Sequence, residues 1–142
     1  MVGMRILVVD DSKMQRWALQ KILEKAGYAT MIAADGQTAL DLTRRDAPDL
    51  ILLDMILPRL DGTAVLGELK NDPKTTDIPV IALTGLSQKN ESRLMESGAA
   101  GFYHKPESGI EEGTGSLLEL IHTVLTEKRW SERQRQLANA AR

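Results

Sequence analysis

Short apolar runs alternate with amphipathic stretches along most of the chain. The third run, Leu50-Ile-Leu-Leu53, contains no polar residue and is followed by Asp54. An apolar run with neither helical nor alternating spacing predicts a strand buried on both faces, as in a parallel sheet. Other runs predict four more strands, and the five predicted strands span residues 5–9, 28–34, 50–54, 78–84 and 99–103.

Apolar residues at helical spacing fill the intervals between these runs and predict helices over residues 12–26, 37–45, 62–71, 87–97 and 116–126. In the first helix, Ser12 is the expected N-cap. Trp17 lies on the apolar stripe of that helix, so we expect its ring in the core. The fourth helix, with Ser87 as its expected cap, has only Leu94 and Met95 as large apolar residues, which predicts light packing and mobility.

Five strands that alternate with five helices predict a parallel sheet with helices on both faces. The 142 residues suit one domain, which we place at residues 4–126. Residues 127–142 are polar and basic, with Trp130 and Leu137 as their only large apolar side chains, and we expect a helical extension or a linker there. A polar loop that contains glycine is expected at 107–116.

Composition narrows the possible functions. The net charge of -2 gives no sign of nucleic acid or an anionic membrane as the main partner. The chain has no cysteine and only two histidines far apart, which argues against thiol catalysis, disulfides and a multi-histidine zinc site. The apolar run before Asp10 is too short for a signal peptide, and no stretch approaches the roughly 20 apolar residues of a membrane span. We therefore expect a cytoplasmic protein that binds neither membrane nor DNA directly.

Polar residues follow four of the five predicted strands at their carboxyl ends. These residues are Asp10 and Asp11, Asp54, Thr84 and Lys105. Right-handed crossovers bring the carboxyl ends of parallel strands to one edge of the sheet, where open α/β sheets bind ligands. The pattern therefore predicts one site that contains three carboxylates, a hydroxyl and an ammonium group.

Three carboxylates in one crevice repel one another and need a cation or a proton nearby. Oxygen ligands alone suit a hard ion such as Mg²⁺, which neutralises phosphoryl oxygens during transfer. Asp54 is then the candidate nucleophile, because a carboxylate can form an aspartyl phosphate. Lys105 supplies positive charge to the phosphoryl group, and Thr84 offers a hydroxyl to one of its oxygens.

Four segments carry a resemblance to a known family. They are Val9-Asp10-Asp11-Ser12, the stretch from Asp54 to Asp61-Gly62, Ala82-Leu83-Thr84-Gly85 and Phe102-Tyr-His-Lys105-Pro106. Together they resemble the receiver domain of bacterial two-component response regulators, over residues 4 to 126. The resemblance implies a flavodoxin-like, doubly wound sheet of five parallel strands in the order 2-1-3-4-5, with five helices.

The resemblance also implies the roles of single residues. It makes Asp54 the phosphoacceptor, with a histidine kinase or phosphotransfer protein as donor. It makes Asp11, Asp54 and the backbone carbonyl of Ile56 the Mg²⁺ ligands, with Asp10 acting through water. By the same resemblance, Lys105 forms a salt bridge with the phosphoryl group.

The switch and the output surface are implied in the same way. Thr84 moves toward the phosphoryl group, and the ring of Phe102 rotates inward behind it. The peptide bond between Lys105 and Pro106 is expected to be cis. The fourth helix, fifth strand and fifth helix form the face that is read by a downstream protein or an attached output domain, and through which a homodimer can form.

Three positions depart from the common pattern of this family. Gly85 stands where alanine is more usual, and the 107–116 loop is several residues longer than usual. At the rim of the site, Ile56 and Leu86 are apolar and cannot orient a hydrolytic water. We therefore expect slow loss of the phosphoryl group.

Two other functions fit parts of this pattern. The first is a Mg²⁺-dependent phosphatase that works through an aspartyl phosphate. It usually needs an Asp-x-Asp pair, whereas Asp10 and Asp11 are adjacent. The second is a receiver-like protein that binds partners without phosphorylation, against which the complete set of Asp11, Asp54, Thr84 and Lys105 argues.

Overall fold

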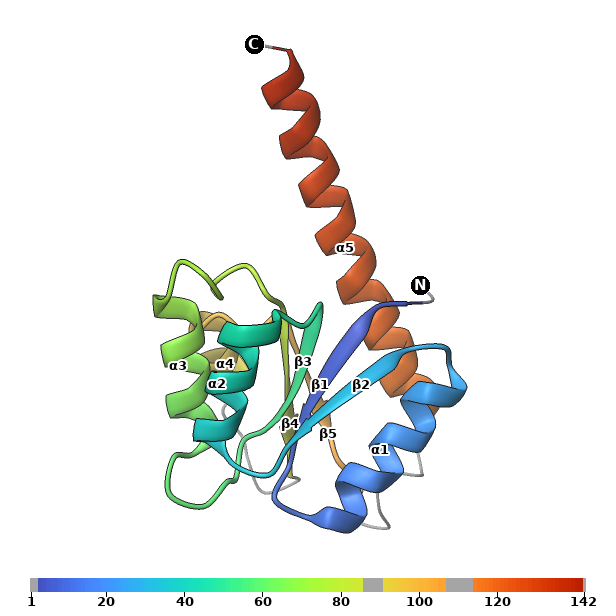
Figure 1. The fold of residues 1–142 in the computed structure, drawn as a ribbon, viewed down its shortest axis with the longest axis vertical. Helices are drawn as coiled ribbons and strands as arrows, with labels where there is room; N and C mark the ends of the chain where they lie inside the picture. The colour runs from blue at the N-terminus through green and yellow to red at the C-terminus, as the bar shows by residue number, and fades with distance from the viewer. Residues whose placement is uncertain (1–2, 86–90, 107–113, 142) are drawn as a thin grey trace.

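The computed structural model describes residues 3–85, 91–106 and 114–141. Strands and helices alternate along the chain (Figure 1). In order they are β1 (Arg5–Val9), α1 (Lys13–Lys25), β2 (Ala29–Ala33), α2 (Gly36–Asp46), β3 (Leu50–Asp54), α3 (Gly62–Asn71), β4 (Val80–Thr84), α4 (Glu91–Glu96), β5 (Gly101–His104) and α5 (Thr114–Ala140). The predicted α/β fold is confirmed.

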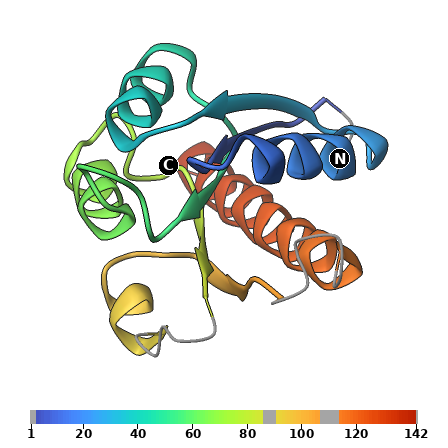
Figure 2. The same cartoon turned by 90° about the horizontal axis from the view of Figure 1, so that it is seen from below.

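All five strands are parallel and lie in the order β2-β1-β3-β4-β5. Helices α1 and α5 cover one face of the sheet, and α2, α3 and α4 cover the other (Figure 2). The register aligns the strand ends: Val9 pairs with Leu53, Asp54 with Leu83, and Thr84 with His104. The sheet therefore has one edge at which the carboxyl ends of its strands lie side by side.

Alternate residues of the central strands enter two separate cores. Ile51 and Leu53 pack with α2 and α3, whereas Leu50 and Leu52 pack with α1 and α5. All five residues of β3 are buried. Each fully buried leucine or isoleucine contributes on the order of 2 kcal/mol to folding, so the apolar run places β3 at the centre of the sheet.

Side-chain caps begin three of the helices. Ser12 Oγ accepts a hydrogen bond from Gln15 N (3.3 Å), as the sequence predicts. Asp35 and Asp61 cap α2 and α3 in the same way. Gly62 follows Asp61 where the backbone of the β3–α3 loop passes very close, since a Cβ there would lie 2.5 Å from the carbonyl oxygen of Asp54. Only glycine fits at that position, which keeps the loop against the end of β3.

Two predictions were wrong. Trp17 is 59% exposed, because the face of α1 that packs on the sheet is the one with Leu19 and Leu23; its ring lies 5.5 Å from Lys21 Nζ. The described residues contain no cis peptide bond, so the bond between Lys105 and Pro106 is trans. The trans form is the more stable one for most bonds before proline, and no described contact at this turn demands the other.

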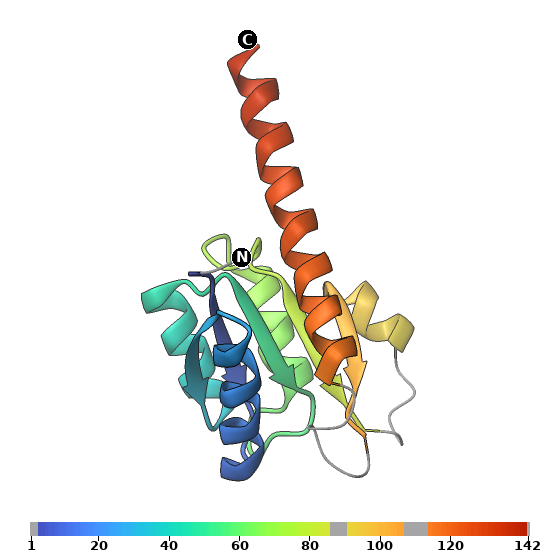
Figure 3. The same cartoon turned by 90° about the vertical axis from the view of Figure 1, so that its right-hand side faces the viewer.

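Helix α5 is longer than the apolar pattern predicts. Its buried residues, Leu117, Ile121, Val124 and Leu125, lie in its first half. Residues 129–140 are all exposed and project beyond the edge at which the strands begin (Figures 1 and 3). Lys128 Nζ donates to the carbonyl oxygen of Asp49 (3.3 Å), at the start of β3. Within the described residues, no helix is long and apolar enough to cross a membrane.

Removal of residues 130–142 tests how the extension relates to the core. Because its described side chains are exposed, we expect the thermal unfolding midpoint to change by less than about 2 °C. Ile121→Ala, in the buried half of the same helix, is the control and is expected to destabilise by about 2–5 kcal/mol. Circular dichroism melts measure both. A large drop in the midpoint of the truncated protein would mean that the extension packs on the domain.

Candidate functional site

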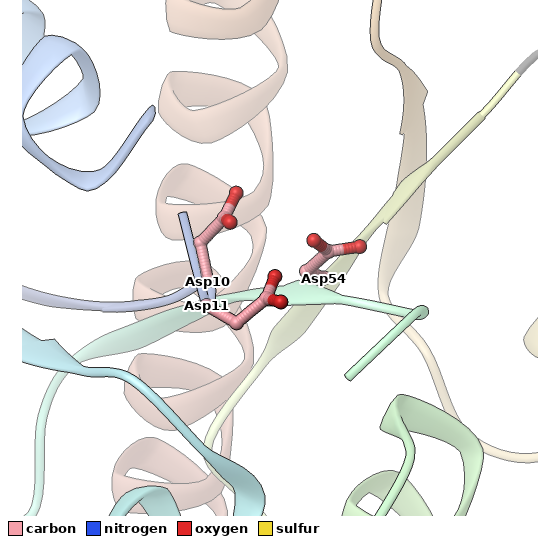
Figure 4. Close-up of side chains that lie close together, drawn as sticks. All are labelled: Asp10, Asp11 and Asp54. Atoms are coloured by element: carbon pink, nitrogen blue, oxygen red, sulfur yellow. The ribbon is translucent and has the colours of Figure 1, made fainter. Parts of the chain in front are cut away.

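Three carboxylates gather at the carboxyl edge of the sheet (Figure 4). Asp10 and Asp11 directly follow β1, and Asp54 is the last residue of the neighbouring β3. One carboxylate oxygen from each residue lies within 4.8 Å of the others. Asp10 and Asp54 are buried, whereas Asp11 is exposed. The predicted acidic cluster is therefore present, with one carboxylate open to solvent.

Asp10 is only half satisfied by hydrogen bonds. Its Oδ1 accepts from Ser12 N (2.9 Å), but among the described residues its Oδ2 is buried without a hydrogen-bond partner. Burial raises the pKa of the Asp10 carboxyl above its ordinary value. The Ser12 N–H and the Lys105 ammonium oppose this rise, and the charges of Asp54 and Asp11 add to it. Among the described residues, the charged form of Asp10 thus has no hydrogen bond at Oδ2, where its ion pair with Lys105 is a long one.

Asp54 is held at both of its carboxylate oxygens. Ile56 N donates to Oδ1 (3.0 Å), and Lys105 Nζ donates to Oδ2 (3.1 Å). Lys105 comes from the end of β5, whose position is fixed by a hydrogen bond from its backbone N to the carbonyl oxygen of Thr84 (2.8 Å). Lys105 Nζ also lies 3.8 Å from Asp10 Oδ2. The structure therefore brings Asp10, Asp54 and Lys105 together as the strand ends predict.

Sequence reasoning missed a third partner of Lys105. Its ammonium group donates to Gln15 Oε1 (3.1 Å), which comes from the first turn of α1. Gln15 is the third residue after the N-cap Ser12, and this spacing is the sequence signal that could have drawn attention to it.

Thr84 points toward β5 in this structure. Its hydroxyl lies 2.9 Å from His104 Nδ1 and 3.5 Å from the carbonyl oxygen of Tyr103. The ring of Phe102 packs against the core and meets the His104 ring edge to face, with 5.7 Å between centroids. His104 thus lies between the two predicted switch residues, and nothing in the apolar pattern of β5 distinguishes it.

A pocket of about 290 Å³ opens above the acidic cluster. It is lined by Asp10, Asp11, Ser12, Gln15, Asp54, Ile56, Gly85 and Lys105. Ile56 is 63% exposed and lines this pocket. Leu86, the other rim residue, lies outside the described residues, as do Ser87 and most of the 107–116 loop.

The donor set of this pocket fits Mg²⁺. Carboxylates with room for water are the ligands that this ion prefers. Asp11 and Asp54 offer oxygens, and Asp10 Oδ2 is a buried acceptor still without a hydrogen bond from the described residues. These three carboxylates are the reason that the pocket suits Mg²⁺.

Residues 6–112 match the model of the response regulator receiver domain. The chain belongs to the response regulator receiver domain family. The predicted resemblance to receiver domains of two-component response regulators is thereby confirmed.

Two curated proteins are similar to this receiver domain. Response regulator PleD of Caulobacter vibrioides is 44% identical over 103 residues, which are 72% of this chain and 23% of PleD. Polar-differentiation response regulator DivK of Brucella anthropi is 36% identical over 102 residues, 71% of this chain and 83% of DivK. The chain thus spans less than a quarter of PleD and most of DivK.

A solved structure shows a related site with metal. The receiver domain of sensor histidine kinase PA1611 from Pseudomonas aeruginosa has a magnesium ion coordinated in its active site cleft. It is 26% identical to this chain, with a TM-score of 0.77 over 88% of this chain and 99% of that one.

The raised pKa of Asp10 predicts the pH dependence of stability without metal. Between the ordinary pKa of 3.8 and the raised value, the folded protein binds more protons at Asp10 than the unfolded chain. The contribution of Asp10 to the free energy of unfolding therefore falls as pH rises through that window. Asp10→Asn keeps an oxygen for Ser12 N and removes the buried charge. In EDTA at pH 7 we expect the variant to melt at a higher temperature than the wild type.

The same melts include two controls. The difference between the proteins should vanish when the pH falls well below 3.8, where Asp10 is protonated in both states. Millimolar Mg²⁺ should stabilise the wild type more than the variant, because a ligand that binds only the folded state adds stability. An Asp10→Asn protein that melts lower than the wild type in EDTA at pH 7 contradicts the prediction.

Proposed function

We propose that this chain is a phosphoacceptor switch in two-component signal transduction. Asp54 receives a phosphoryl group from a histidine kinase or phosphotransfer protein in the presence of Mg²⁺. The observation that carries the proposal is the 3.1 Å contact between Lys105 Nζ and Asp54 Oδ2 inside a cluster of three carboxylates. A plain strand cap at Asp54 needs neither the ammonium nor the other two acids.

In the proposed reaction, an oxygen of Asp54 attacks the phosphorus of a phosphohistidine. A P–O bond forms and the P–N bond breaks, and the electron pair returns to the imidazole nitrogen, which takes a proton. Bound Mg²⁺ supplies positive charge to the phosphoryl oxygens. Lys105 lies close enough to Asp54 Oδ2 to form an ion pair with the new phosphoryl group. Asp11, Asp54, Asp10 through water and the Ile56 carbonyl are the proposed holders of the ion.

The proposed switch begins at Thr84. Its hydroxyl leaves His104 Nδ1, now 2.9 Å away, for a phosphoryl oxygen. Phe102, whose ring touches that of His104, then turns inward. The change is read on the face formed by α4, β5 and α5, where Met95 is already 45% exposed. A downstream protein, an attached output domain or a second copy is the proposed reader.

The proposed role is that of a signalling module and not of an enzyme that turns over an external substrate. It assists only its own phosphorylation and dephosphorylation. We further infer a cytoplasmic location. Residues 4–126 are not expected to bind DNA or a membrane directly. Residues 127–142 are proposed as a helical extension that either links the domain to another segment or docks on a partner. These parts rest on family membership and on the sequence.

Phosphorylation by a small donor tests the central step. We expect phosphoramidate and Mg²⁺ to give a protein that is heavier by one phosphoryl group in intact-mass spectra. Asp54→Asn should lack the adduct because the amide is not a nucleophile of this kind. Asp41→Asn, at an exposed position of α2, is the matched control and should keep it. A wild type that forms no adduct, or rapid turnover of several phosphate esters, contradicts the proposal.

The apolar rim predicts a long-lived adduct. Ile56→Asn places an amide beside the phosphoryl group, where it can orient water, so we expect faster decay after the donor is removed. The double variant with Leu86→Asn should decay faster still. Ile32→Asn replaces an apolar residue that is 42% exposed on β2, away from the pocket, and should decay like the wild type. A half-life that stays the same or lengthens in Ile56→Asn would falsify the idea.

A further inference from the structure

The side chain of Gln15 contacts Lys105 and does not make the capping hydrogen bond that its position in α1 predicts. Ser12 and Gln15 have the Ser-x-x-Gln spacing of a capping box, in which the glutamine reaches back to the backbone N–H of the cap residue. Here that N–H donates instead to Asp10 Oδ1 (2.9 Å). The Gln15 side chain is thereby released from the cap, and its Oε1 accepts from Lys105 Nζ (3.1 Å).

Gln15 thus shares the Lys105 ammonium with the acidic cluster. Nζ lies 3.1 Å from Asp54 Oδ2 and 3.1 Å from Gln15 Oε1, but 3.8 Å from Asp10 Oδ2. The last distance is longer than a hydrogen bond. Asp10 Oδ2 is also the buried oxygen that has no hydrogen-bond partner among the described residues. A half-buried ammonium beside such an oxygen would move onto it unless other acceptors held it back.

We propose that Gln15 is a positioning residue that holds Lys105 on Asp54 and away from Asp10. The amide oxygen gives the ammonium a neutral acceptor on the side of the pocket formed by α1. Asp10 then keeps its charge available to a hydrated divalent cation. This inference rests on the proposed function, because the value of that arrangement lies in a site that binds Mg²⁺ and a phosphoryl group together.

Loss of the amide oxygen has a defined consequence. In Gln15→Met, the side chain keeps its length and helix propensity but cannot accept the hydrogen bond. The ammonium then pairs with Asp10 Oδ2 and competes with the cation for its charge. A hydrogen bond to a charged group, partly screened in an open pocket, corresponds to about a threefold to tenfold change in an equilibrium constant. We expect Mg²⁺ affinity to fall by about that factor.

The experiment compares three proteins. Isothermal titration calorimetry measures Mg²⁺ affinity in the wild type, Gln15→Met and Gln20→Met. Gln20 lies on the same helix and donates to Thr30 Oγ1 (3.3 Å), outside the pocket, so its variant controls for the glutamine-to-methionine change. NMR of the Lys105 side chain, in protein without metal, reports directly on the ammonium. We expect a changed Lys105 signal and weaker Mg²⁺ binding only in Gln15→Met.

Two results would overturn the proposed role of Gln15. Equal Mg²⁺ affinity and an unchanged Lys105 signal in Gln15→Met overturn the inference. A loss of affinity shared by Gln20→Met also overturns it, because the effect then belongs to the helix. Neither measurement uses a phosphoryl donor, so failure of phosphorylation at Asp54 is detected separately by mass spectrometry and can occur with or without the Gln15 effect.

Discussion

The ion pair between Lys105 and Asp54 is the interaction on which the site depends. Three carboxylates with oxygens within 4.8 Å repel one another, and among the described residues Lys105 is the cation that contacts Asp54. The pair forms only because β5 ends beside β4, with Lys105 N bonded to the Thr84 carbonyl oxygen (2.8 Å). A one-residue slip of β3 or β5 against β4 would turn one of these two side chains to the opposite face of the sheet. The register of the sheet is therefore also the geometry of the site.

The apolar strands offset the electrostatic strain at their ends. Ile6 to Val9, Leu50 to Leu53 and Val80 to Leu83 are almost fully buried, and they anchor Asp10, Asp54 and Thr84 from below. A buried carboxylate with one unsatisfied oxygen lowers stability, and sites of this kind persist where the surrounding core is strong enough to hold them. Stability thus comes from the apolar strand residues, whereas the polar side chains of the site stand only at the strand ends.

The sequence predicted most of the fold and the acidic and basic residues of the candidate site, but not the contacts of Gln15 and His104. The strands, their parallel arrangement and the shared edge follow from short apolar runs that end in polar or turn residues, because runs of this length bounded in this way favour buried strands over helices. Trp17 shows the limit for helices: Met14 and Trp17 belong to a stripe with helical spacing but are exposed, because the sheet selects the neighbouring face with Leu19 and Leu23. An apolar stripe predicts that one side of a helix is buried, but it does not decide which of two adjoining faces packs on the sheet.

The contacts of Gln15 and His104 show a second limit. Each contact depends on where a neighbouring element places its partner. Ser12 N donates to Asp10 Oδ1, so Gln15 does not cap it. The β4–β5 register places His104 beside Thr84. The spacing from Ser12 marks Gln15 as a capping-box residue, but neither segment alone shows that Gln15 contacts Lys105 or that His104 contacts Thr84. Long-range pairs of this kind need the packed structure.

Helix α5 links the chemistry at one edge of the sheet to the surface at the other. Its first turns pack on β5, where a Cβ at Gly101 would lie 3.2 Å from Leu120 Cδ1, and β5 carries Phe102 and His104. Its 27 residues form one continuous helix, on the order of 40 Å long at 1.5 Å per residue. Lys128 ties the helix to the Asp49 carbonyl oxygen, beyond which it is exposed. In the proposed switch, a rigid rod held near its middle would convert a small tilt at β5 into a larger displacement of its exposed half, so the length of that half would set how far a change at Thr84 reaches.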